Sequence, residues 1–217
     1  MTPSLPTPGS GPAADLHLIG SAGPLWRVWH PSGHTPSAAT LRNWGPIARF
    51  DPQPAGPPVT HHQVWVWYGS HGFDVSALEV FARGGSVAEI CPTWRGSLID
   101  IDDAGMVDLT SEQSCGPLGA SPRLGDTNLD AVGYDIPQSW GRHLQAAGAD
   151  GVVFRSCRAA PHGVNTVVYE PSALSGTAAQ HRLIDDALYP FLLVALDAAG
   201  VGIRRVDRCG RCGPPAT

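Results

Sequence analysis

Val64-Trp65-Val66-Trp67-Tyr68 is strongly β-prone, and a segment of helical character follows it closely. Its β-branched and aromatic residues favour an extended strand. Asp74 can cap a helix that carries Ser76 to Phe81, and the Gly84-Gly85 pair can end it. The sequence therefore predicts a strand over residues 64–68 and a helix that begins near residue 74.

Further elements lie on both sides of this pair. A helix that starts near Pro137 places Trp140, Leu144 and Ala147 on one face. The strands do not alternate regularly with helices, and the chain has no Gly-x-Gly-x-x-Gly or Walker-type motif. We therefore expect a single α+β domain, with residues 102–135 left as unassigned loops and strands at 25–29, 87–90, 98–101, 152–154 and 166–169.

Composition excludes several classes of protein. Of the 217 residues 15% are charged, and the net charge of -5 disfavours direct binding to nucleic acid. The longest apolar run, residues 187–196, falls short of the roughly 20 residues of a spanning helix. Five scattered cysteines do not resemble a secreted disulfide framework. A cytoplasmic protein without membrane contact is expected.

The two ends of the chain differ from its middle. Residues 1–23 are a Pro/Gly/Ser/Ala mixture that we expect to be disordered, and residues 205–217 are expected to form a flexible tail. The domain then spans residues 24–204. It closes with a helix predicted over residues 177–199, which Pro190 should kink. The apolar stripe of this helix either packs on the sheet or forms a homo-oligomer or partner interface; its members are Leu183, Ile184, Ala187, Leu188, Phe191, Leu192 and Ala195.

Several short motifs occur in a fixed order along the chain. They are Ala48-Arg49-Phe50-Asp51-Pro52, Val66-Trp67-Tyr68, Ala77-Leu78-Glu79-Val80 and the stretch from Gly148 to Arg158, with Gly163-Val164-Asn165 after them. In this order they resemble the motifs of the RES domain, the toxin half of RES–Xre toxin–antitoxin systems. The chain departs from the family pattern at Ile47-Ala48, where a glycine pair is usual, and by a proline-rich insertion at residues 52–58.

The resemblance implies an ADP-ribosyltransferase-like split mixed β-sheet with flanking helices. It also implies an NAD-degrading toxin, acting by hydrolysis or phosphorolysis and controlled by an Xre-type antitoxin. NAD would then be a substrate, with inorganic phosphate as a second substrate in the phosphorolysis reading, and no bound cofactor is expected.

The candidate residues suit this chemistry. Arg49, or in second place Arg27, offers a rigid fork of donors for a pyrophosphate. Cleavage of nicotinamide from ribose develops oxocarbenium character, which a carboxylate such as Glu79 stabilises. Tyr68 can stack on nicotinamide or position the sugar, and the Ser156 hydroxyl can bond to ribose or the carboxamide.

Simpler interpretations compete with these roles. Glu79 can be a surface helix residue that pairs with Arg83 four positions later. Tyr68 can be part of the core, Arg27 can stack on Trp26 or Trp29, and Ser156 can be an ordinary turn residue. The same residues also fit transfer of ADP-ribose to a protein, or a catalytically silent domain that binds a nucleotide or a partner protein.

The metal-ligating residue types give a weaker signal. Cys209-Gly210-Arg211-Cys212 has the spacing of a zinc knuckle, but structural zinc needs four ligands and no second pair at suitable spacing accompanies it. His61, His62 and His71 are expected to be surface residues, since adjacent side chains on a strand point to opposite faces. No metal site is therefore predicted.

Overall fold

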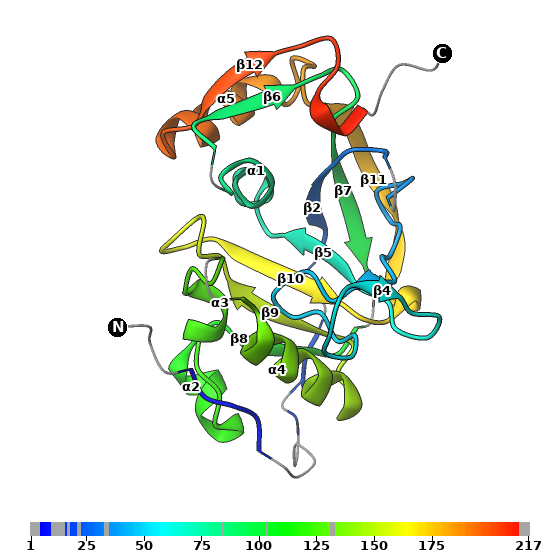
Figure 1. Cartoon of the computed structure of the whole chain (residues 1–217), viewed down its shortest axis with the longest axis vertical. Helices are drawn as coiled ribbons and strands as arrows, with labels where there is room; N and C mark the ends of the chain where they lie inside the picture. Colours follow the sequence, from blue (N-terminus) through cyan, green and yellow to red (C-terminus); the bar gives the residue numbers. More distant parts are fainter. Residues whose placement is uncertain are drawn as a thin grey trace.

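The fold is built on one eight-stranded sheet (Figure 1). The computed structural model describes residues 5–9, 16, 18–20, 23–32, 35–83, 85–102, 104–130 and 133–212. The β8–β9 pair is parallel and the other pairs are antiparallel, so the sheet is mixed. In spatial order its strands are β1 (Leu18–Ile19), β8 (Met106–Leu109), β9 (Gly151–Arg155), β10 (Val164–Val168), β5 (Trp67–Ser70), β2 (Leu25–Trp29), β7 (Arg95–Ile101) and β11 (Leu174–Arg182).

The sheet is split near its middle. Strand β5 pairs with β10 over four residues, and β2 pairs with β7 over five. Between β2 and β5 the register consists of the single pair Trp26 and Ser70. Figure 1 shows the two groups of strands diverging on either side of this junction. This is the split sheet that the family resemblance implies.

Helix α1 (Phe73–Phe81) follows β5 directly and lies at the junction (Figure 1). Its inner face joins a core with α5 (Tyr189–Ala198) and the parallel pair β6 (Val87–Ile90) and β12 (Gly202–Arg205). Burial of such side chains contributes about 1.5–3 kcal/mol each, so this core fixes the orientation of α1. Its buried members include Ala77, Leu78, Ile90, Leu192 and Leu196.

Helix α4 (Asp135–Ala146) covers the other half of the sheet. Its buried Trp140 and Leu144 pack in one core with Phe50 and Val152. Gly141 allows a close approach, because a Cβ at this position would lie 2.5 Å from the carbonyl oxygen of Phe50. The helix thereby supports the loop that carries Arg49.

Shorter elements complete the chain. Segment 102–135, which the sequence leaves as an unassigned, loop-rich region, contains β8, α2 (Glu112–Cys115), η1 (Gly116–Leu118) and α3 (Arg123–Asp126). A separate hairpin-like pair is formed by β3 (Trp44–Gly45) and β4 (Val59–Thr60), and the remaining turns are η2 (Pro171–Ala173) and η3 (Gly210–Cys212).

The predicted fold class is confirmed: the chain is one α+β domain with a large mixed sheet flanked by helices. The strands expected at 25–29 and 87–90 and the helix near Pro137 are present as β2, β6 and α4. Among the described helices, none is long and apolar enough to cross a membrane.

The helix predicted over residues 177–199 is wrong in its first half. Residues 174–182 form β11, which pairs with β7 along most of its length, so sheet pairing overrides local helical preference. The helix begins only at Tyr189, with Pro190 in its first turn, where proline needs no backbone partner and causes no kink.

The start of α1 also differs from the prediction, because its N-cap is Gly72 rather than Asp74.

Both predicted disordered ends are partly ordered. Leu5 is buried in a core, the indole of Trp140 donates to the carbonyl of Pro6, and β1 pairs with β8. At the other end β12 includes Arg205, and Cys209 is buried. The rest of these predictions falls on residues 1–4, 10–15, 17, 21–22 and 213–217, outside the described residues.

Candidate functional site

A cleft of about 310 Å³ opens at the split of the sheet. Four of the predicted site residues line it, each from a different element: Arg27 from β2, Tyr68 from β5, Glu79 from α1 and Arg49 from the loop after β3. The volume lies at the lower end of the range for small-molecule sites, roughly 300–1,000 Å³. Arg27 and Arg49, which are 22 positions apart in the sequence, thus line one cleft.

The cleft has a strongly positive lining although the whole chain is acidic. Among the described residues, Glu79 is the one carboxylate that lines it. A cavity lined by one sign of charge concentrates ligands of the opposite sign. The arginines that line it are Arg27, Arg42, Arg49, Arg83, Arg158 and Arg211.

The Glu79 carboxylate is held by two side chains, Ser156 just after β9 and Asn165 in β10. Ser156 Oγ donates to Glu79 Oε1 at 2.6 Å, and Asn165 Nδ2 donates to the same oxygen at 2.7 Å. Ser70 Oγ in turn donates to Asn165 Oδ1 at 2.7 Å. Oε2 of Glu79 has no hydrogen-bond partner within the described part of the chain. One carboxylate oxygen is thus fixed while the other is available to a ligand.

Ser156 lies behind Glu79 rather than on the cleft wall. Its side chain is buried, and its Oγ accepts hydrogen bonds from the backbone amides of Arg158 at 3.1 Å and Ala159 at 3.2 Å. These two donors leave the hydroxyl proton directed to Glu79. In this geometry Ser156 orients the carboxylate.

Arg49 is buried at the base of the cleft. Its Nη1 donates to the carbonyl of Leu124 at 3.0 Å, its Nη2 contacts Cys157 Sγ at 3.4 Å, and its guanidinium lies over the ring of Tyr134. These contacts use two of the five N–H donors of a guanidinium. The other three have no partner among the described residues.

A buried carboxylate organises the loop that carries Arg49. Asp51 accepts hydrogen bonds from Arg42 Nη2 at 2.7 and 2.9 Å and from the amides of Ile47 and Ala48. The Tyr68 hydroxyl also donates to Asp51, at 2.9 Å. Burial, followed by the charge of Asp51, raises the pKa of Tyr68 well above its ordinary value. Tyr68 therefore stays a neutral donor that joins β5 to this loop.

Arg27 lines the same cleft from β2. Its Nη1 donates to the carbonyls of Ala38 and Thr40, and the guanidinium lies over the ring of Trp67. Burial, with a smaller effect of the nearby Arg42, lowers the pKa of Arg27 to about 9. The group still carries its charge at neutral pH.

The surface-helix interpretation of Glu79 does not match the contacts of its carboxylate. Arg83 Nε donates to the backbone carbonyl of Glu79, not to the side chain. The carboxylate instead meets Ser156 and Asn165. Glu79 is thus directed inward to the sheet.

Some residues of the cleft had no predicted role. Asn165 lines the cleft and stands within a quoted motif, as does Asp51, which is buried and organises the loop that carries Arg49. Trp94 and Arg211 also line the cleft, and they meet there as a cation–π pair 5.5 Å apart. Nothing local in the sequence indicated this last contact.

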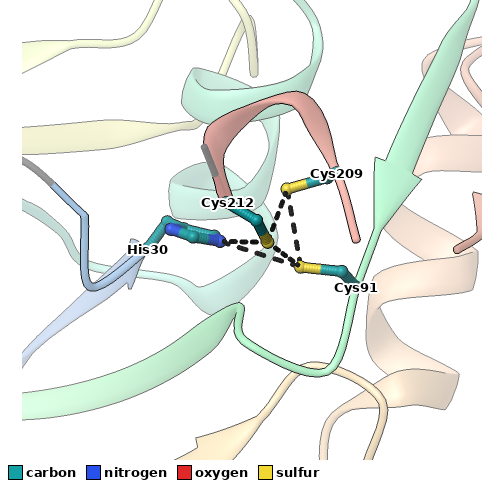
Figure 2. Close-up of side chains that lie close together, drawn as sticks. All are labelled: His30, Cys91, Cys209 and Cys212. Atoms are coloured by element: carbon teal, nitrogen blue, oxygen red, sulfur yellow. Dashed lines mark hydrogen bonds between the residues drawn. The ribbon is translucent and has the colours of Figure 1, made fainter. Parts of the chain in front are cut away.

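Three thiols and one imidazole gather beside the cleft (Figure 2). The ligand atoms of His30, Cys91, Cys209 and Cys212 all lie within 4.8 Å of one another. Burial opposes ionisation of Cys91, but hydrogen bonds from the Thr93 backbone, His30 and the other two thiols lower the pKa of Cys91 to about 6. Spacing along the sequence gave no partner for the Cys209–Cys212 pair, whereas the fold supplies two.

Comparison with known proteins gives a family and a structural neighbour. The family model described as "RES domain" matches residues 24–187. The crystal structure of the M. tuberculosis MbcT–MbcA toxin–antitoxin complex contains a chain of similar fold, with a TM-score of 0.52 and 17% identity, over 79% of this chain and 92% of that one. No curated protein matches.

Proposed function

Since the chain belongs to the RES domain family, we propose that it consumes NAD by breaking the bond between nicotinamide and ribose. One observation carries the proposal: Arg49, Tyr68 and Glu79, which the sequence scatters over 31 positions, line one cleft at the split of the sheet. Arg49 offers a guanidinium for the pyrophosphate and Glu79 a carboxylate for the reacting ribose, while the Tyr68 hydroxyl holds the loop that carries Arg49.

Binding would rest on the arginines. A dinucleotide carries two negative charges on its pyrophosphate, and a guanidinium can hold two phosphate oxygens at once. Arg49 has donors to spare and a fixed position, so it is the main candidate for this contact. Arg27 faces the same cleft and would act as the second clamp.

Glu79 would stabilise the transition state. When the glycosidic C–N bond breaks, its electron pair leaves with nicotinamide, which departs as a neutral amine and needs no general acid. Positive charge then grows at the anomeric carbon, where a fixed carboxylate lowers the barrier. The hydrogen bonds from Ser156 and Asn165 hold that carboxylate without a rearrangement during the reaction.

The acceptor completes the balance. With water, a new C–O bond gives ADP-ribose and releases one proton. With phosphate, the same carbon receives a phosphate oxygen, giving ADP-ribose 1″-phosphate. A protein side chain is the third possible acceptor. Among these acceptors, the arginine-rich lining of the cleft favours an anion such as phosphate over a cationic group.

Product analysis tests the proposal. The purified chain would be incubated with NAD, with and without inorganic phosphate, and the products separated by chromatography. We expect free nicotinamide in every case, with either ADP-ribose or ADP-ribose 1″-phosphate as its partner. A mass gain on protein would redirect the proposal to ADP-ribosyl transfer. Unchanged NAD under all conditions would mean a catalytically silent domain.

We extend the proposal to a toxin held inactive by an antitoxin, acting in the cytoplasm. The support is the structural neighbour, which was solved as a toxin–antitoxin complex; the Xre type of antitoxin rests on the family resemblance. Expression should halt growth, and coexpression of a neighbouring Xre-type gene should restore it, with its product copurifying with the chain. Growth arrest that survives in a Glu79→Gln variant would separate toxicity from NAD consumption.

The face of α5 is the proposed site of contact with another copy. Leu188 and Leu192 of the predicted stripe are buried, but Phe191 is 64% and Val194 71% exposed. Exposed apolar side chains on one helix face favour association. Light scattering after size exclusion should give a dimer that a Phe191→Ser, Val194→Ser double variant converts to monomer.

A further inference from the structure

The cluster beside the cleft has the dimensions of a tetrahedral metal site (Figure 2). The three sulfur atoms lie 3.4 Å (Cys91 to Cys209), 3.5 Å (Cys91 to Cys212) and 3.9 Å (Cys209 to Cys212) apart. His30 Nε2 lies 3.7 Å from Cys91 Sγ and 3.4 Å from Cys212 Sγ. Zinc bonds of about 2.3 Å to sulfur and about 2.0 Å to nitrogen give tetrahedral edges of about 3.8 and about 3.6 Å.

Neither a disulfide nor apolar packing accounts for the whole cluster. A disulfide would require two sulfur atoms about 2.05 Å apart and would leave a third thiol in contact with it. Apolar packing does not explain why an imidazole nitrogen points at two sulfur atoms inside a core. Deprotonated thiolates around a divalent cation account for all four side chains at once.

The backbone presents these side chains from three separate segments. His30 follows β2, Cys91 follows β6, Cys209 precedes the turn η3 and Cys212 is its last residue. In that turn the amide of Cys212 donates to the carbonyl of Cys209 at 2.9 Å, which directs both sulfur atoms to one side. Figure 2 shows all four side chains pointing to a common centre.

We propose that His30, Cys91, Cys209 and Cys212 bind one Zn²⁺ ion as a structural site. Four protein ligands of the Cys₃His type close the coordination sphere and leave no position for a substrate, which is the arrangement of structural zinc. The proposal is independent of the proposed NAD activity, because none of the four ligands takes part in it.

The ion would fasten the end of the chain to the wall of the cleft. The family match ends at residue 187, so two of the four ligands lie in a segment that follows it. Arg211 sits between these two cysteines, stacks on Trp94 and lines the cleft. Zinc would thus hold Arg211 at the site while joining β2, β6 and the chain end.

Metal content is the direct test. The full chain would be expressed in zinc-supplemented medium with a tag free of histidine and analysed by plasma mass spectrometry. We expect about one zinc per chain, and loss of it in Cys209→Ser and Cys212→Ser. Cys115→Ala is the matched control: it removes a buried thiol from another core and should retain the metal.

Cobalt reconstitution covers the case in which the serine variants do not fold. Co²⁺ added to the metal-depleted native chain should give the intense visible bands of tetrahedral cobalt with thiolate ligands, and zinc should abolish them. Chelation should lower the melting temperature of the native chain. Native protein without zinc that also shows no cobalt bands, or one that contains a disulfide between these cysteines, would overturn the proposal.

Discussion

The cleft and the cysteine–histidine cluster lie side by side, but their residues are distributed differently along the sequence. The Glu79, Arg49 and Tyr68 side chains each belong to a local motif of several residues. In the cluster, His30 and Cys91 are single residues outside any motif. His30 lies 61 positions before Cys91, and Cys91 lies 118 positions before Cys209. Sites carried by motifs can therefore be found from order along the chain, whereas sites assembled from single residues require the fold.

The largest expected effect concerns the cleft side of this comparison. Asp51→Ala removes the acceptor of Arg42, two amides and Tyr68, and leaves the largely buried Arg42 charge without its carboxylate. Breaking a buried pair in this way costs about 3–5 kcal/mol. Chemical denaturation should show that loss, while Asp186→Ala, an exposed carboxylate, should cost almost nothing. Unchanged stability would contradict the role of Asp51.

The next effect separates chemistry from stability. Glu79→Gln should lower NAD turnover by on the order of 10²–10³-fold, about 3–4 kcal/mol, because a neutral amide does not stabilise an oxocarbenium-like centre. The melting temperature should move little. Glu112→Gln, on an exposed helix, is the control and should keep full activity. Full activity of Glu79→Gln would remove it from the catalytic role and leave it as a residue that only joins α1 to Ser156 and Asn165.

A smaller effect is expected for the pyrophosphate contact. Arg49→Lys keeps the charge but loses the fork of donors, so binding should weaken by about 1.5–3 kcal/mol, or roughly 10- to 150-fold in KM. Arg123→Lys, exposed on α3, should leave KM unchanged. Were the KM of Arg49→Lys also unchanged, the main clamp would be Arg27.

The smallest effect tests whether the two regions cooperate. Arg211→Ala removes one positive charge from the cleft wall, which for an exposed group is worth about 0.5–1 kcal/mol toward an anionic substrate and predicts a rise in KM of about two- to five-fold. Zinc content should not change, because Arg211 is not a ligand. Arg204→Ala, which loses an exposed pair with Glu89, is the control. An unchanged KM in Arg211→Ala would mean that the cluster and the cleft are neighbours without coupling.

Local sequence predicted the parts of the fold in which one signal dominates. Strand 25–29 and helix 135–146 have apolar patterns that match their burial. In residues 177–182 no single local signal dominates. They belong to β11 because they pair with the edge of β7, and the local sequence does not indicate this pairing. Likewise, the identity of Glu79 as a candidate followed from its motif, but its contacts with Ser156 and Asn165 depend on how α1 meets β9 and β10.

The packing of α5 against α1 matters to anyone who shortens this chain at the family boundary. A version ending at residue 187 would retain every motif residue of the cleft, yet it would delete α5 and β12. Leu78 and Ala77 would then face water on the helix that carries Glu79. We expect such a fragment to aggregate or to lose activity for reasons unrelated to chemistry. The core that supports α1 therefore includes residues well beyond the end of the family match.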